Sequence, residues 1–208
     1  MSGIATHITG SEPFWQRVRQ TFSAIRPTRA EPAAPRGRSV RIEEELEAAW
    51  DYSASRNVSM SVIVVELDLM TEFFSVYGRA VADDCVATAA EIIAEMLPRA
   101  NSHCLPLDRA SFIVVLPDYP ALMARKLAET IAETIADEAI AHKESHAGVV
   151  TASAGLVVVN PRDGFNASLF DAAAEALKKA QRRGLGRVEL VDMRPMQQEQ
   201  QVLHEEAA

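Results

Sequence analysis

Residues 62–68 read VIVVELD, and residues 102–117 read SHCLPLDRASFIVVLP. The second stretch holds two apolar runs on either side of a turn-rich DRAS. Continuous apolar runs bounded by turn residues are typical of buried strands. The first stretch ends in two acids, Glu66 and Asp68. A strand that ends in carboxylates beside a tight hairpin is a place where a two-metal phosphoryl-transfer site can form. These stretches therefore predict a sheet with a candidate site at one strand end.

Helices are predicted around these strands because apolar residues recur at helical spacing. The expected helices cover residues 39–52, 69–77, 80–97, 119–141 and 167–183, and further strands cover 148–159 and 188–191. Gly78 and Gly184 are natural helix stops. Strands separated by single and paired helices, with one hairpin, predict an α+β fold. It is an α/β sandwich in which helices surround a mainly antiparallel central sheet.

Four stretches of the chain match one known family in order and spacing. They read ELDLMTEFFSVYGRAVAD at 66–83, DRASF at 108–112, VTASAG at 150–155 and AAEALKKAQRRGLGRV at 173–188. In these stretches the chain resembles the GGDEF domain, the module of diguanylate cyclases that joins two GTP molecules into cyclic di-GMP. The resemblance extends over residues 58–191 and implies the palm-like fold of that family. It also implies a place in bacterial cyclic di-GMP signalling.

The metal-binding positions of that family differ in this chain. The resemblance places the two metal-holding carboxylates at Glu66 and Ala110, and Ala110 has no oxygen to offer. Glu66 is longer than the aspartate of the family, and Asp108 is a substitute only if its side chain turns inward. Ser111 stands at the position of the glutamate in the signature loop. We therefore expect no catalytic residue and no cofactor. Only if the protein is an enzyme do we expect a metal ion, which would be Mg²⁺ with Glu66 as its ligand.

The signature loop has also lost its two glycines, which permit positive φ and a close approach of phosphate to the backbone. Asp108 and Arg109 take their places. Aspartate tolerates left-handed geometry, whereas that geometry is unfavourable for Arg109. A reshaped hairpin tip is therefore expected.

Nucleotide contacts are changed as well. The guanine-reading Asn and Asp of the family fall on Phe74 and Asp83, and its triphosphate-binding Lys and Arg fall on Gln181 and Leu185. Asp83 alone keeps a group that can bind a guanine edge, although a surface position on a helix is the simpler interpretation. A charge clamp on a triphosphate requires placement as well as charge. Nucleotide binding is therefore expected to be weakened at both ends of the ligand.

Two further residues, Arg99 and Asp68, are interpreted separately from the metal and nucleotide positions. Arg99 keeps the arginine of the Arg-x-x-Asp product-binding site of the family, but Ser102 stands in place of its acid. Only a remnant of a feedback site for cyclic di-GMP is expected there. Asp68, the second acid of the strand, is expected to cap or salt-bridge the fold rather than hold a metal.

Other metal-capable side chains are scattered along the chain. Cys85 and Cys104 fall inside a predicted helix and a predicted strand, and we expect buried free thiols. His142 and His146 have the i, i+4 spacing of a helical metal pair. They lie in a charged connector without a third ligand nearby, so solvated surface positions are expected.

Charge is distributed unevenly. The net charge is −8, but residues 1–41, with seven arginines against two glutamates, carry +5, so the remaining residues carry −13. An acidic body argues against nucleic acid as a partner. No apolar run approaches the roughly 20 residues of a membrane helix, and no signal-peptide core is visible. These features predict a cytoplasmic protein.

Three parts are expected along the chain: a partly disordered basic arm and linker at 1–38, a domain at 39–192 and a disordered tail at 193–208. Within the arm, residues 11–26 combine apolar side chains at helical spacing with arginines. Such a segment can contact an anionic membrane surface or a partner. The alternative is that the segment packs on its own domain or frays.

Metal, guanine and triphosphate contacts are thus all changed together. We interpret the chain as a catalytically inactive, degenerate GGDEF protein that regulates signalling by contact with another protein or with itself. One alternative is a weak diguanylate cyclase in which Glu66 and Asp108 hold metal. The other is a protein that binds GTP or cyclic di-GMP without turnover.

Overall fold

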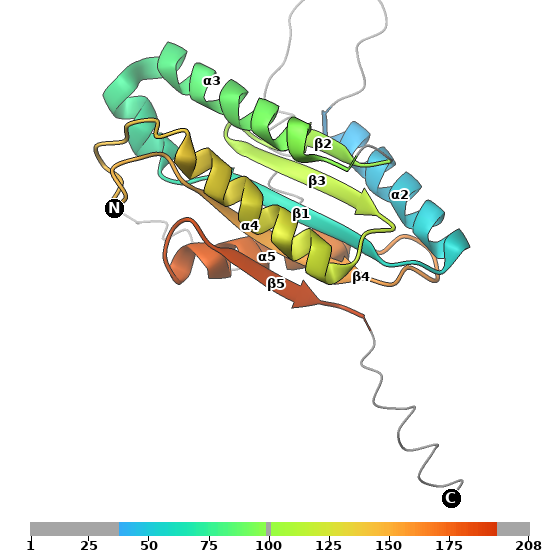
Figure 1. Cartoon of the computed structure of the whole chain (residues 1–208). Coiled ribbons are helices and arrows are strands. Elements are labelled where there is room, and N and C mark those ends of the chain that lie inside the picture. Colours follow the sequence, from blue (N-terminus) through green and yellow to red (C-terminus); the bar gives the residue numbers. More distant parts are fainter. Residues whose placement is uncertain (1–37, 99–100, 195–208) are drawn as a thin grey trace, which may run out of the picture.

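Figure 1 shows the computed structural model, which describes residues 38–98 and 101–194. In this part of the chain, four helices cover one five-stranded sheet. The strands are β1 (Met60–Leu67), β2 (His103–Pro106), β3 (Ser111–Pro117), β4 (Ala152–Val159) and β5 (Val188–Asp192). Their order across the sheet is β2-β3-β1-β4-β5.

β1 lies at the centre of the sheet and pairs antiparallel with β3 and β4. β2 is antiparallel to β3, and β5 runs parallel to its neighbour β4. Because helices cover both faces of β1, nearly all of its apolar run is buried. The predicted α+β fold with a mainly antiparallel central sheet is confirmed.

A layer of helices lies on each side of the sheet. The helices are α2 (Arg38–Arg56), α3 (Met70–Met96), α4 (Ala121–Asp137) and α5 (Ser168–Arg182). α3 and α4 cover one face, and α2 and α5 cover the other (Figure 1). None of the described helices is both long enough and apolar enough to cross a membrane.

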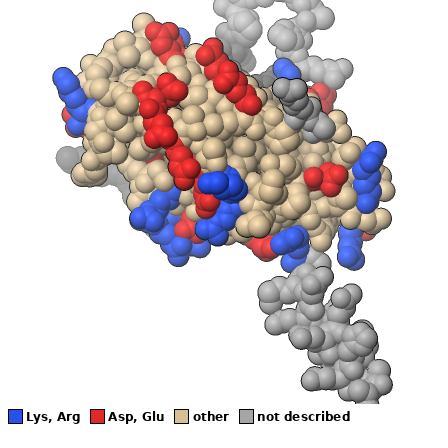
Figure 2. All heavy atoms as spheres, in the orientation of Figure 1, with Lys and Arg blue, Asp and Glu red and all other residues tan. Residues whose placement is uncertain are grey.

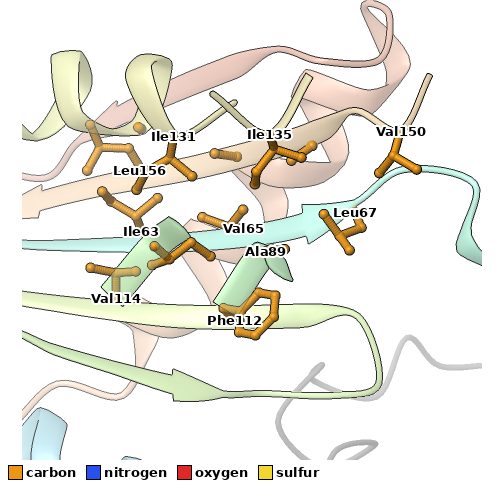
Figure 3. Close-up of a cluster of buried hydrophobic side chains, with 14 of the residues drawn as sticks. Ile63, Val65, Leu67, Ala89, Phe112, Val114, Ile131, Ile135, Val150 and Leu156 are labelled. Atoms are coloured by element: carbon orange, nitrogen blue, oxygen red, sulfur yellow. The ribbon is translucent and has the colours of Figure 1, made fainter. Parts of the chain in front are cut away.

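The side chains of β1 alternate between the two helical layers. Ile63, Val65 and Leu67 pack in the core beneath α3 and α4 (Figure 3). Val62 and Val64 pack on the side of α2 and α5. All five are at most 2% exposed, and burial of each such side chain stabilises the fold by about 1.5–3 kcal/mol. This packing fixes the position of the acids at the end of the strand.

α3 contains a kink at Gly78, where φ is 81°. A positive φ of this size favours glycine because it has no Cβ. The two helices predicted at 69–77 and 80–97 correspond to the two arms of this element. The first arm begins at Met70, directly after β1, and so forms part of the surroundings of its acids.

α5 lies very close to β4 at Gly155. A Cβ on Gly155 would lie 2.1 Å from the carbonyl oxygen of Ala173 and 2.3 Å from the backbone nitrogen of Leu177. Any side chain at this position would push α5 away from the sheet. The glycine therefore allows the close packing that brings the end of α5 beside the end of β1.

The connector between α4 and β4 differs from its prediction. α4 ends at Asp137, earlier than expected, and His142 is 1% exposed, so the prediction of a solvated His142 is wrong. The connector folds back, and the His142 N–H donates to the carbonyl oxygen of Gly148 at 2.9 Å. Nε2 of the His142 ring lies 3.1 Å from the carbonyl oxygen of Leu69. The ring also packs edge-on against the ring of Phe73. The turn before α3 encloses this histidine, although its sequence neighbours are charged.

His146 and the two cysteines lie closer to expectation. His146 is exposed, and among residues 38–98 and 101–194 no three His, Cys, Asp or Glu side chains come together as a metal site. Cys85 and Cys104 are free thiols, the first buried and the second half-buried. Burial raises the pKa of Cys104 to about 11, which makes it a poor nucleophile at neutral pH.

Three stretches lie outside the described residues: 1–37, 99–100 and 195–208. The expectations for the basic arm, for its segment 11–26 and for Arg99 therefore fall outside the structure. The predicted tail begins at Met193, whose N–H donates to the carbonyl oxygen of Val158 at 2.8 Å. The edge of the sheet thus continues to this residue.

Candidate functional site

A cleft of about 920 Å³ opens at the end of β1. Four parts of the chain form it: the end of β1, the first half of α3, the tip of the β2–β3 hairpin and the C-terminal end of α5. β1 and the hairpin belong to one sheet, which gives the cleft a rigid base. Its volume falls in the usual range of ligand pockets, about 300–1,000 Å³.

The residues singled out from the sequence meet in this cleft. It is lined by Glu66, Asp83, Asp108, Ala110 and Ser111. It is also lined by the residues that replace nucleotide contacts of the family, which are Phe74, Gln181 and Leu185. The positions that motif spacing singled out thus line one cleft, whereas Arg99 lies outside the described residues.

Glu66 is held from two sides. Gln181 Nε2 donates to Glu66 Oε1 at 3.0 Å, and Ser111 Oγ lies 3.5 Å from Glu66 Oε2. Burial raises the pKa of Glu66 above its ordinary value, and the charges of Asp68 and Asp108 raise it further, while the two hydrogen bonds oppose this effect. Both carboxylate oxygens are thus already engaged, and the group has a raised affinity for a proton.

The hairpin tip turns without a positive φ at Asp108 or Arg109. The N–H groups of Leu107 and Asp108 both donate to the carbonyl oxygen of Ser111, at 2.8 and 3.3 Å. Asp108 Oδ1 accepts a hydrogen bond from the N–H of Arg109 at 2.8 Å. The loop closes through bonds to Ser111, so Arg109 does not take the left-handed geometry that would be unfavourable for it.

As they stand, these side chains do not fit a Mg²⁺ ion. Magnesium takes oxygen ligands at about 2.0–2.1 Å in near-octahedral geometry, usually from carboxylates and substrate phosphates. The oxygens of Glu66 face hydrogen-bond donors, and Asp108 binds its own loop. Ala110 contributes a methyl group. This end of the cleft therefore does not offer a metal the pair of free carboxylates that the resemblance would require.

The wall formed by α3 carries Phe74 and Asp83. Phe74 is 41% exposed and presents a ring where recognition of a base edge would require polar atoms. Asp83 lies on the surface and pairs with Arg79 one helical turn earlier, with Nε 3.4 Å from Oδ2. This geometry agrees with the simpler interpretation of Asp83 as a surface residue.

Asp68 has an environment of another kind, although it lies two residues after Glu66. It is 3% exposed. Its carboxylate accepts hydrogen bonds from Thr151 Oγ1 at 2.7 Å, Ser153 Oγ at 2.8 Å and the Gly186 N–H at 2.9 Å. These bonds tie the end of β1 to the start of β4 and to the turn before β5. Asp68 therefore stabilises the fold, through neutral donors rather than through a salt bridge.

Two pairings in the cleft go beyond the sequence prediction. In the sequence, Gln181 counts only as a lost phosphate contact, whereas in the structure it is the donor to Glu66, 115 positions away. No local pattern reports a contact over such a separation. The sequence does contain a signal for the pair of Arg79 and Asp83, because opposite charges at i, i+4 on a predicted helix are expected to meet.

The fold and the cleft together define a class of protein. A sheet with an acid-ended strand at its centre and a hairpin tip beside those acids is the arrangement of the palm-like cyclase domains. The family model described as "Diguanylate cyclase, GGDEF domain" matches residues 39–187. The chain belongs to the GGDEF family, and the resemblance seen in four motifs is confirmed.

Solved structures share this fold at low sequence identity. The active GGEEF domain of a diguanylate cyclase from Vibrio cholerae is 20% identical, with a TM-score of 0.65 over 73% of this chain and 94% of that chain. The GGDEF domain of DgcB from Caulobacter crescentus, solved in complex with c-di-GMP, is 18% identical, with a TM-score of 0.66 over 77% of this chain and 97% of that chain. Likeness at this level of identity establishes the fold alone.

A third similar structure contains a protein partner. The diguanylate cyclase SiaD from Pseudomonas aeruginosa, solved with its activator SiaC, is 17% identical, with a TM-score of 0.63 over 73% of this chain and 57% of that chain. No curated protein matches the sequence significantly. Similar GGDEF structures thus include complexes with c-di-GMP and with a protein.

Proposed function

We propose that this chain is a GGDEF protein without diguanylate cyclase activity, which regulates cyclic di-GMP signalling by binding another protein or a second copy of itself. The observation that carries the proposal is the arrangement around Glu66. Its oxygens are engaged by Gln181 and Ser111, and Ala110 stands where the second metal-holding acid would be. A cyclase needs metal ions that bridge phosphate oxygens and activate the attacking hydroxyl.

The nucleotide side of the cleft supports the same proposal. Phe74 and Leu185 line it at positions where the family has a base-reading amide and a phosphate-binding cation. One such change can be compensated by a neighbouring side chain. Changes at the metal, at the base and at the phosphate remove three kinds of contact at once. Turnover requires all of them in the same complex.

Regulation by protein contact is consistent with what the chain has kept. The buried strand, the Asp68 hydrogen bonds and the close packing at Gly155 all serve the fold. A similar structure, that of SiaD, contains a protein activator. A cytoplasmic location, with contact to a membrane or a partner through residues 11–26, belongs to the same proposal.

Calorimetry of the full chain with GTP and with cyclic di-GMP, each with Mg²⁺, tests this function. We expect no heat of binding and no formation of cyclic di-GMP from GTP. An active GGDEF domain measured in parallel serves as the positive control. Turnover that Glu66→Ala abolishes would establish the enzyme instead. Tight binding of cyclic di-GMP that Arg99→Ala abolishes would establish a receptor.

A further inference from the structure

We propose that the cleft at the end of β1 holds residues 11–26 of the same chain. The inference rests on the proposed function in one respect, because a cleft that binds no nucleotide is free for another occupant. It names the occupant as a basic, aromatic segment attached to the same domain. Docking there would regulate the arm, since a docked segment cannot meet a partner or a membrane.

The lining of the cleft combines carboxylates with apolar side chains. Besides the internally bonded Asp68, the acids of the lining are Glu66, Glu72, Asp83 and Asp108, and its bases are Arg79 and Arg109. Arg79 is already paired with Asp83. Apolar groups of the lining include Met70, Phe74, Val86 and Leu185. Acidic groups also gather over α3 and α4 in Figure 2. Such a surface suits an occupant with both cationic and apolar side chains.

Residues 11–26 have this composition. They read SEPFWQRVRQTFSAIR, with three arginines against one glutamate and five large apolar side chains. An amphipathic helix of this pattern presents apolar anchors at i, i+3, i+4 spacing to a groove. The charge of the segment is opposite in sign to that of the cleft lining. The exposed ring of Phe74 would be covered by such an anchor.

The connection to the domain permits this docking. Residues 27–37 join the segment to Arg38, where α2 begins, and an extended chain of that length spans up to about 36–40 Å. A short turn joins α2 to β1, so α2 runs back along the sheet (Figure 1). Its first residues therefore point toward the end of β1 that carries Glu66.

Attachment also favours this occupant over a free one. A segment on a short linker acts at an effective concentration on the order of millimolar. A partner in solution, or the segment of a second copy at ordinary protein concentration, lacks that advantage. The segment of the same chain therefore needs only modest affinity to fill the cleft.

Trp15 reports on the docking. The sequence has two tryptophans, and the other one, Trp50, is 5% exposed. In the full chain, the Trp15 signal is the difference between the wild type and Trp15→Phe. We expect this signal to be protected from acrylamide quenching relative to a synthetic peptide of residues 11–26. The cleft variant Phe74→Ser with Glu72→Lys is expected to lose the protection and to quench like the peptide.

A matched control changes the same kinds of residue elsewhere. Leu122→Ser with Glu91→Lys alters an exposed apolar side chain and an exposed acid that do not line the cleft. This variant is expected to keep the protection of the wild type. Arg17→Glu with Arg19→Glu changes the segment itself and is expected to lose it, which covers the case of a cleft variant that fails to fold. Equal quenching of wild type, cleft variant and control would overturn the proposal.

Two further measurements identify other occupants. Protection that disappears on dilution would assign the segment to a second copy and overturn docking within one chain. The second measurement is a titration with vesicles of phosphatidylcholine and phosphatidylglycerol, in which membrane binding shifts the fluorescence emission of Trp15 to the blue. The wild type is expected to need a higher lipid concentration for this shift than the cleft variant. The same lipid dependence in both would show a free membrane-binding segment and would also overturn docking.

The failure of this inference is distinguishable from the failure of the proposed function. Calorimetry with GTP and Mg²⁺ on the same full-length preparations reports nucleotide binding whether or not Trp15 is protected. Heat of GTP binding would contradict the proposed function. Unprotected Trp15 without GTP binding would overturn only the docking.

Discussion

Glu66 and Asp68 are two acids on one strand end, yet the protein uses them in opposite ways. Asp68 is buried and accepts three hydrogen bonds from neutral donors. Glu66 is half-buried, lines the cleft and meets one donor at 3.0 Å and another at 3.5 Å. Side chains two apart on a strand point to the same face, so the difference comes from the groups that pack around each acid.

The comparison shows where the chain has kept its GGDEF character and where it has changed. Donors to Asp68 come from the VTASAG stretch and from the turn before β5, both within the motifs that carry the resemblance. Donors to Glu66 include Gln181, which stands at a position of the family that binds phosphate. Contacts that stabilise the fold and contacts at positions where the family carries out its chemistry are thus separable within one strand end.

The largest effect is expected at Asp68. Asp68→Ala leaves the donors of Thr151, Ser153 and Gly186 without their acceptor in a buried place. Each buried donor that loses its partner costs about 1–3 kcal/mol, so we expect the free energy of unfolding to fall by about 3–5 kcal/mol. Urea denaturation monitored by circular dichroism measures this change.

Glu66→Ala is the matched control for that measurement. It removes a carboxylate from the same strand end, but from a half-buried position on the cleft. We expect a loss of less than about 1.5 kcal/mol, because the donors of Gln181 and Ser111 can turn to water. Equal losses for the two variants would contradict the division between a structural acid and a cleft acid.

The central part of the fold follows from the sequence, whereas the ends of its elements do not. β1 and β3 were predictable because a strand covered on both faces is continuously apolar. The end of α4 was missed because Ala139, with a φ of 53°, stops the helix without a glycine or proline to signal it. The start of β4 was placed too early because Val149 forms only an isolated bridge to Ala141.

The candidate site shows the same limit. Motif spacing placed Glu66, Ala110 and Asp83 around one cleft, because the family fold fixes where these positions lie. The sequence did not reveal that Gln181 donates to Glu66, since that contact depends on how closely α5 packs on β4. It also misled at His142, whose charged neighbours suggested solvent while a backbone carbonyl and Phe73 enclose the ring.

A smaller effect is expected at Gln181. Gln181→Ala removes the 3.0 Å hydrogen bond to Glu66, and we expect a loss of about 1–2 kcal/mol in the free energy of unfolding at pH 7. Because this bond lowers the pKa of Glu66, its removal should also move that pKa upward, which NMR titration of the side-chain carboxyl detects. Lys178→Ala, which breaks an exposed pair with Glu175, is the control and should cost less than about 1 kcal/mol. A Glu66 pKa that stays unchanged in Gln181→Ala would contradict the contact.

The pH dependence of stability distinguishes Glu66 from ordinary acids. Its pKa is raised in the folded protein, chiefly by burial, so the folded state holds a proton that the unfolded state has released above a pH of about 4.3. Stability therefore falls as pH rises from that value through the raised pKa, and the full cost of the charge is present above it. Glu66→Gln should remove this decline, so that its stability relative to the wild type improves as pH rises through the window. Denaturation curves at a series of pH values test this, and a parallel pH profile in the two proteins would contradict it.

The smallest effect is expected at Asp83, the acid that a guanine reader would need. Its pair with Arg79 is exposed, with side-chain exposures of 70% and 81% and a distance of 3.4 Å. Exposed pairs one helical turn apart contribute about 0.3–0.5 kcal/mol, so Asp83→Asn should change the free energy of unfolding by no more than that. Addition of salt should shrink the difference further.

Thermal unfolding of wild type and variant, with and without GTP and Mg²⁺, completes the comparison. We expect GTP to leave both midpoints unchanged, because Phe74 and Leu185 leave this acid without partners for a nucleotide. A midpoint raised by GTP in the wild type but not in Asp83→Asn would mean that Asp83 belongs with the functional acids rather than with the surface of α3.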